Sequence, residues 1–128
     1  MVELSDLRWD ERGLLPVVIQ DVRTGEVLML ARMNREALAR TRRTGVVHLW
    51  DEAAGEMVEG GEATGSALHV VEVRVNCQAD ALLLQVNAAG PACRSGERSC
   101  FHRCLAPPRS LSAIAWGRDA AEGDEQNP

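Results

Sequence analysis

Two β-type runs joined by a short polar turn occupy residues 67–86, which read ALHVVEVRVNCQADALLLQV. The first run alternates, so that its odd-numbered valines share one face with Cys77, while Glu72, Arg74 and Asn76 share the other. The second run, 81–86, is apolar and returns after the turn at 78–80. The pattern predicts an antiparallel hairpin with Cys77 at the end of its first strand, which is a rigid position for a metal ligand.

The residues before this hairpin predict another hairpin followed by one helix. Apolar runs at 14–21 and 27–33 flank a turn signal at 23–26. Asn34 is a favourable N-cap, and Gly45 ends the predicted helix of residues 35–44. A short strand at 46–50 and a polar, glycine-rich segment at 51–66 follow. Together these elements predict an α+β fold that is mostly β.

Length, charge and the termini narrow the class of protein. The 128 residues predict a lead-in (1–12), one domain (13–106) and a C-terminal extension (107–128) whose acidic end is expected to be disordered. The formal net charge of −5 argues against nucleic-acid binding. No run reaches the roughly 20 apolar residues that span a bilayer, and the N-terminus lacks the pattern of a secretory signal. We therefore expect a cytoplasmic protein with reduced thiols and no membrane partner.

All four cysteines fall between Cys77 and Cys104, in a region rich in Gly, Pro and Ser. Thiolates are good ligands for Zn²⁺, and a flexible loop can turn several of them toward one point. No CxxC pair is present, so the spacing is not that of an ordinary zinc finger. Disulfides, a single reactive thiol and buried apolar cysteines are the alternatives. Reducing conditions favour a metal over disulfides.

From about Gly13 to Phe101 the chain resembles the phosphoribosyl-AMP cyclohydrolase family, zinc enzymes that open the adenine ring during histidine biosynthesis. The matching segments are 13–16, 24–31, 33–38, 44–45, Trp50, 61–62, Gly65, Cys77, Asp80, 82–83, 90–93, Gly96 and 99–101. The resemblance implies an intertwined homodimer in which Cys77 of one subunit and Cys93 and Cys100 of the other bind Zn²⁺. Three protein ligands leave a position for water, as in catalytic zinc sites.

Two departures from the family pattern concern the metal and the proton-transfer group. Asn76 and Gln78 stand where the family has metal-binding aspartates. Asp80 is then the one carboxylate left in this motif and is a candidate metal ligand, although a single carboxylate argues against Mg²⁺ binding as in the family. Arg94 stands where the family has a histidine associated with proton transfer, and an arginine cannot act as a base.

A third departure concerns the substrate. Asp51, Glu52 and Glu59 lie in stretches where the family carries arginines and a lysine. Coulomb repulsion from these acids would disfavour a doubly phosphorylated ligand. We therefore expect a divergent zinc-dependent cyclohydrolase or hydrolase of specialised metabolism, with an acidic pocket and negligible activity on phosphoribosyl-AMP. It would add water to the C=N, amidine-type centre of a non-phosphorylated or cationic small molecule.

Such a reaction needs a group that moves protons, and the candidates are His102, then Glu59, Glu62 and His69. Two alternatives stay open: an ordinary phosphoribosyl-AMP cyclohydrolase, and a non-catalytic homologue in which zinc only holds the dimer together. Whether Cys104 binds the zinc decides if the site has an open position for water. As a fourth ligand it would make the zinc structural, whereas as a spare thiol, which we expect, it leaves the water position open.

Overall fold

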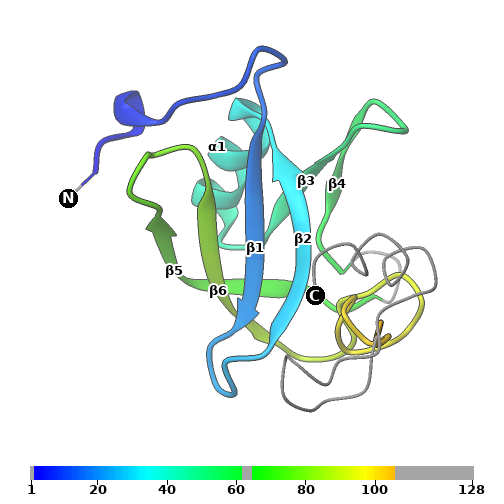
Figure 1. Cartoon of the computed structure of the whole chain (residues 1–128). Coiled ribbons are helices and arrows are strands. Elements are labelled where there is room, and N and C mark those ends of the chain that lie inside the picture. The colour runs from blue at the N-terminus through cyan, green and yellow to red at the C-terminus, as the bar shows by residue number, and fades with distance from the viewer. Residues whose placement is uncertain (1, 62–64, 106–128) are drawn as a thin grey trace, which may run out of the picture.

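The computed structural model describes residues 2–61 and 65–105, and within them it shows an α+β fold made mostly of strands (Figure 1). A four-stranded sheet has the order β2-β1-β6-β5, and a two-stranded sheet joins β3 to β4. The elements are a short 3₁₀ turn η1 (Leu4–Asp6), β1 (Leu15–Asp21), β2 (Val27–Met33), α1 (Arg35–Thr44), β3 (His48–Asp51), β4 (Glu56–Glu59), β5 (Leu68–Val75) and β6 (Leu82–Ala88). The predicted fold class is confirmed.

Strands β1 and β2 form the predicted N-terminal hairpin, with Leu15 opposite Met33 and Ile19 opposite Met29. Every second residue of β1 is buried, which reflects its apolar alternation. The last buried position of β1 is Asp21, whose side chain is 0% exposed. A carboxylate in that position requires a cationic or hydrogen-bonding partner.

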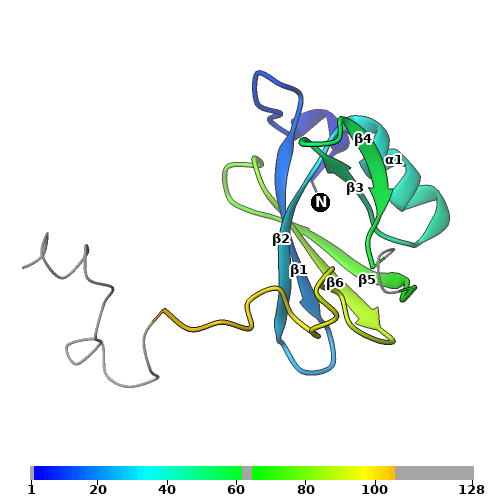
Figure 2. The same ribbon diagram turned by 90° about the vertical axis from the view of Figure 1, so that its right-hand side faces the viewer.

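Helix α1 has the boundaries and caps that its sequence predicts. The Asn34 Oδ1 atom accepts a hydrogen bond from the Ala37 N–H at 2.8 Å, and Gly45 ends the helix with a left-handed φ of 78°. The Gly45 N–H donates to the Thr41 carbonyl at 2.8 Å. Ala37, Leu38 and Thr41 are buried, and the helix packs against β2 and β3 (Figure 2).

The second predicted hairpin, β5–β6, is also present and antiparallel. Strand β6 additionally pairs in parallel with β1, from Val17 opposite Leu82 to Asp21 opposite Val86, and this pairing has no local sequence signal. Strand β5 is at the edge of the sheet and has a bulge between Val70 and Glu72. The valine face predicted for this strand is open within one chain, since Val71 is 52% exposed and Val73 is 42% exposed.

Strand β4 was not predicted, because it lies within the polar, glycine-rich segment of residues 51–66. It pairs with β3, with Trp50 opposite Met57. Asp51 closes the turn between them: its Oδ1 atom accepts from the Ala53 N–H at 3.0 Å, and its carbonyl accepts from the Gly55 N–H at 2.7 Å. The adjacent Met57 and Val58, between glutamates, are the apolar signal that was overlooked. In the described part of the chain, no helix is long and apolar enough to cross a membrane.

Candidate metal centre

A loop after β6 brings two of the predicted ligands, Cys93 and Cys100, together. The Cys93 N–H donates to the Glu97 carbonyl at 3.2 Å, and the Gly96 N–H donates to the Cys93 carbonyl at 2.9 Å. The chain therefore turns back on itself directly after Cys93. The side chains of Cys93 and Cys100 lie close enough for each thiol to shift the pKa of the other. Two of the three predicted zinc ligands are thus adjacent in a single chain.

The surroundings of the two thiols differ, and so do their pKa values. The Ser95 hydroxyl lies 3.1 Å from the Cys93 Sγ atom and the Ser95 N–H lies 3.5 Å from it, and these hydrogen bonds lower the pKa of Cys93. Partial burial, and then the neighbouring Cys93, raise the pKa of Cys100 to about 11. Cys93 therefore loses its proton before Cys100 does, and a cation that binds both sulfurs would displace the protons of both thiols.

We expect Ser95→Ala to raise the pKa of Cys93, because the thiolate loses its hydroxyl donor. The pH profile of Cys93 alkylation by iodoacetamide in metal-free protein should then move to higher pH, since the thiolate is the reacting form. Peptide mass spectrometry can follow Cys93 separately, with Cys104 in the same molecule as the internal control. An unchanged profile, or a shift to lower pH, would contradict the role given to Ser95.

The third predicted ligand, Cys77, is exposed in the turn between β5 and β6. Asn76 organises this turn: its Oδ1 atom accepts from the N–H groups of Asp80 at 2.9 Å and Ala81 at 3.0 Å. Its Nδ2 atom donates to the Asp80 carboxylate at 2.6 Å. The lead-in is tied to the same turn, because the Arg8 N–H donates to the Ala79 carbonyl at 2.7 Å. The Asp80 carboxylate, a predicted metal ligand, is therefore engaged by a side-chain amide.

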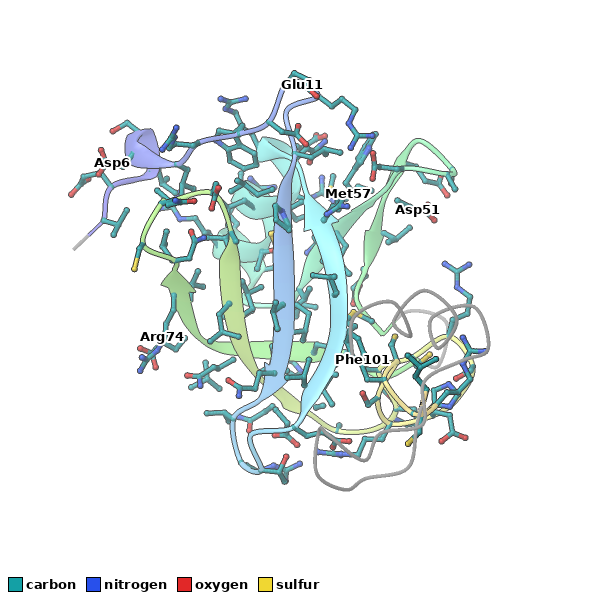
Figure 3. The ribbon with its side chains drawn as sticks, in the orientation of Figure 1. Asp6, Glu11, Asp51, Met57, Arg74 and Phe101 are labelled. Carbon is teal, nitrogen blue, oxygen red and sulfur yellow. The ribbon has the colours of Figure 1, made fainter. Side chains whose placement is uncertain are left out.

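Strand β6 separates the Cys77 turn from the Cys93 loop, because the turn precedes Leu82 and the loop follows Ala88. Seven residues of strand extend about 20 Å at roughly 3.3 Å per residue. Figure 3 shows the same separation, with Arg74 beside the turn and Phe101, which follows Cys100, on opposite sides of the molecule. Accordingly, no group of three potential metal ligands comes together among the residues that the structure describes.

A cavity of about 330 Å³ is adjacent to the cysteine loop. Met29, Leu49 and Val58 supply apolar walls, and Glu59 and Arg94 supply charged ones. Glu59 is thus the one predicted proton-transfer residue, of those described, that lines this cavity. His102 is exposed in the segment after Cys100, His69 is exposed on β5, and Glu62 lies outside the described residues.

The acids that follow Trp50 are paired with arginines from other parts of the chain. The Glu52 carboxylate lies 2.5 Å from the Arg12 guanidinium and 3.1 Å from that of Arg32. The Asp51 carboxylate lies 3.9 Å from the Arg94 guanidinium. These cations compensate the negative charge that the local sequence suggested. The prediction of an acidic pocket did not take into account these arginines, which are distant in sequence.

The sequence interpretation also missed three residues that shape the cysteine loop: Ser95, Arg98 and Asp21. Ser95 contacts the Cys93 sulfur, and the Arg98 side chain pairs with the buried Asp21 carboxylate. An available signal was the acid at the end of an apolar strand, because a buried carboxylate requires a cationic partner. The sequence could not say which of its arginines would be that partner.

Comparison with known proteins points to one family. The family model described as phosphoribosyl-AMP cyclohydrolase matches residues 29–102. Phosphoribosyl-AMP cyclohydrolase from Archaeoglobus fulgidus is 47% identical over 100 residues, which cover 78% of this chain and 93% of that protein. The corresponding enzyme from Methanococcoides burtonii is 44% identical over 103 residues, or 80% of this chain and 85% of that protein.

A longer relative carries the same similarity on part of its length. The histidine biosynthesis bifunctional protein HisIE of Thermus thermophilus is 49% identical over 104 residues, which cover 81% of this chain. The aligned part is 49% of that protein, so the chain spans about half the length of this bifunctional relative.

The expectation of a non-phosphorylated or cationic substrate in specialised metabolism is wrong, because relatives this similar are named phosphoribosyl-AMP cyclohydrolase. The expectation of negligible activity on phosphoribosyl-AMP is withdrawn with it. The physical error was to treat Asp51 and Glu52 as uncompensated charges, whereas Arg12, Arg32 and Arg94 pair with them. The relatives are cyclohydrolases, enzymes that hydrolyse C–N bonds of rings.

Proposed function

Because this chain belongs to the phosphoribosyl-AMP cyclohydrolase family, we propose that it hydrolyses phosphoribosyl-AMP, opening the adenine ring as one step of histidine biosynthesis. The observation that carries the proposal is the adjacent Cys93–Cys100 pair beside a cavity that Arg94 lines. The pair offers sulfur to a metal, and the guanidinium offers a cation to a phosphate.

We further propose a zinc site made of Cys93 and Cys100 from one subunit and Cys77 from a second copy. The donor set fits Zn²⁺: three cysteine sulfurs, one with a lowered pKa, leave one tetrahedral position open. Within one described chain the three do not come together, because β6, about 20 Å long, lies between the Cys77 turn and the loop that carries the other two. In a two-fold dimer the same contact occurs twice, so each dimer would hold two sites.

The exposed apolar surface near the Cys77 turn supports such a dimer. The edge strand β5 presents Val71 and Val73 to solvent, and an unpaired apolar edge is a surface on which another chain can pack. Beside it is a groove of about 530 Å³ whose lining includes Leu4, Leu38 and Val75.

Residues of this chain then have separate tasks in the reaction. Met29, Leu49 and Val58 would face a planar base, and Arg94 would hold a phosphate. We assign proton transfer to Glu59, because it lines the cavity, whereas His102 does not. When bound, zinc supplies Lewis-acid activation of water near neutral pH. No task is assigned to Mg²⁺, because Asn76 already engages the Asp80 carboxylate.

Purified protein tests this function directly. We expect about one zinc per chain by elemental analysis and hydrolysis of phosphoribosyl-AMP that stops when a chelator removes the metal. Restored growth of a histidine auxotroph that lacks this enzyme is the matching cellular result. Zinc-loaded protein that leaves phosphoribosyl-AMP unchanged would refute the proposal.

A further inference from the structure

The buried Asp21 carboxylate, at the end of β1, pairs with a guanidinium from the cysteine loop and lies 3.8 Å from that of Arg23 in the adjacent turn. Its Oδ2 atom pairs with the Arg98 guanidinium, and its Oδ1 atom accepts from the Arg23 N–H at 3.0 Å. The Asp21 side chain is 0% exposed, whereas that of Arg98 is 41% exposed. A fully buried carboxylate holds its partner far more firmly than an exposed one, because water cannot replace the interaction.

Arg98 connects the buried Asp21 carboxylate to both cysteines. Its carbonyl accepts from the Ala92 N–H at 3.2 Å, which fixes the backbone immediately before Cys93. Along the chain, Arg98 is two residues before Cys100. Movement of Arg98 would therefore move both sulfur atoms relative to the sheet.

The residues that follow Arg98 fasten the loop to strand β2. The Ser99 hydroxyl donates to the Val27 carbonyl at 2.7 Å, and the Cys100 N–H donates to the Leu28 carbonyl at 2.7 Å. Ser99 is buried, so this seam of hydrogen bonds between the cysteine loop and β2 is shielded from solvent. Together with the Asp21–Arg98 pair, the seam fixes the Cys100 backbone against the β1–β2 hairpin.

We propose that Asp21 and Arg98 are positioning residues that hold Cys93 and Cys100 at the separation and orientation required for zinc. This inference rests on the proposed zinc site. Neither side chain touches the metal in this arrangement, since each acts through the backbone of the loop. Residues that orient metal ligands typically change metal affinity by about 10–100-fold when they are replaced.

Zinc release to a chromogenic chelator tests the inference on the full-length zinc protein. We expect Asp21→Asn and Arg98→Gln each to increase the release rate about tenfold or more, with Arg98→Lys intermediate because lysine keeps the charge but loses the planar fork. In cobalt-substituted protein both variants should alter the sulfur-to-cobalt absorption, which reports ligand geometry. Glu26→Gln is the matched control: Glu26 pairs with the same guanidinium but is exposed, so we expect less than about a twofold change.

The outcomes separate the possible errors. Arg98→Gln keeps an amide donor for the buried Asp21 carboxylate, which also retains the Arg23 N–H, so it decides the question if Asp21→Asn does not fold. Zinc release and cobalt spectra like those of the wild type in a folded Arg98→Gln protein would overturn the positioning role alone. A wild-type protein without zinc would overturn the proposed metal site as well. Equal effects of Glu26→Gln and Arg98→Gln would also overturn the positioning role, because the buried Asp21 carboxylate would then matter no more than the exposed Glu26 carboxylate.

Discussion

Cys93→Ser should remove zinc and lower the rate of phosphoribosyl-AMP hydrolysis by about a thousandfold or more. Cys93 is the proposed ligand whose pKa is lowered, through hydrogen bonds from the hydroxyl and N–H groups of Ser95. A serine hydroxyl is a poor substitute for a thiolate at zinc. Metal catalysis contributes several kcal/mol, and each 1.36 kcal/mol corresponds to tenfold in rate, which gives about three powers of ten.

Cys104→Ser is the matched control, because Cys104 is an exposed cysteine in the same segment. We expect it to keep its zinc and to retain activity within about twofold, as a spare thiol should. Elemental analysis and steady-state rates measured on both variants decide the matter. If Cys93→Ser retained a full equivalent of zinc, or if Cys104→Ser lost it, the ligand set proposed for this site would be incorrect.

Mixing two inactive variants should restore activity. Cys77→Ser and Cys93→Ser each lack a ligand for every site in their own dimers, so each alone should show less than about a thousandth of wild-type activity. After unfolding and joint refolding, random assortment places one chain of each kind in half of the dimers. Each mixed dimer would hold one complete site, so the mixture should recover about a quarter of wild-type activity.

This result would depend on the sharing of ligands between subunits. If one chain supplied all of its own ligands, every chain in the mixture would still carry a defect and no activity would return. The control is Cys93→Ser mixed with Cys100→Ser, in which no pairing of chains yields a complete site. Recovery in that control would contradict the arrangement, as would failure of the Cys77 and Cys93 mixture although mixed dimers form.

The elements with local signals could be predicted from the sequence. The helix was predictable because Asn34 and Gly45 mark its ends, and the hairpins were predictable because apolar runs flank short turns. Strand β4 was missed because its two apolar residues lie within a glycine-rich, acidic stretch. The parallel pairing of β1 with β6 was beyond prediction, since nothing near either strand specifies the other.

Some features of the candidate site could likewise be predicted from the sequence, and others could not. The spacing of the cysteines only favoured a metal, and the predicted ligand set came from the resemblance to a family; two of those cysteines lie near each other. The charge around them could not be predicted, because it depends on contacts between distant residues. Glu52 is paired with Arg12 and Arg32, and Asp21 is paired with Arg98 at a separation of 77 residues. Reading acids only against their sequence neighbours led to the wrong substrate.

The position of β6 in the middle of the sheet has a consequence for folding. Gln20 of β1 and Gln85 of β6 are 65 residues apart in sequence, yet their side chains hydrogen-bond at 3.0 Å. Closing a loop of that length is slow compared with forming either hairpin. During synthesis, one edge of β1 therefore stays unpaired until β6 has been made. In that interval the unpaired edge can associate with other chains and lead to aggregation. Both cysteine segments flank β6, so the proposed zinc site could assemble only after β6 has been inserted.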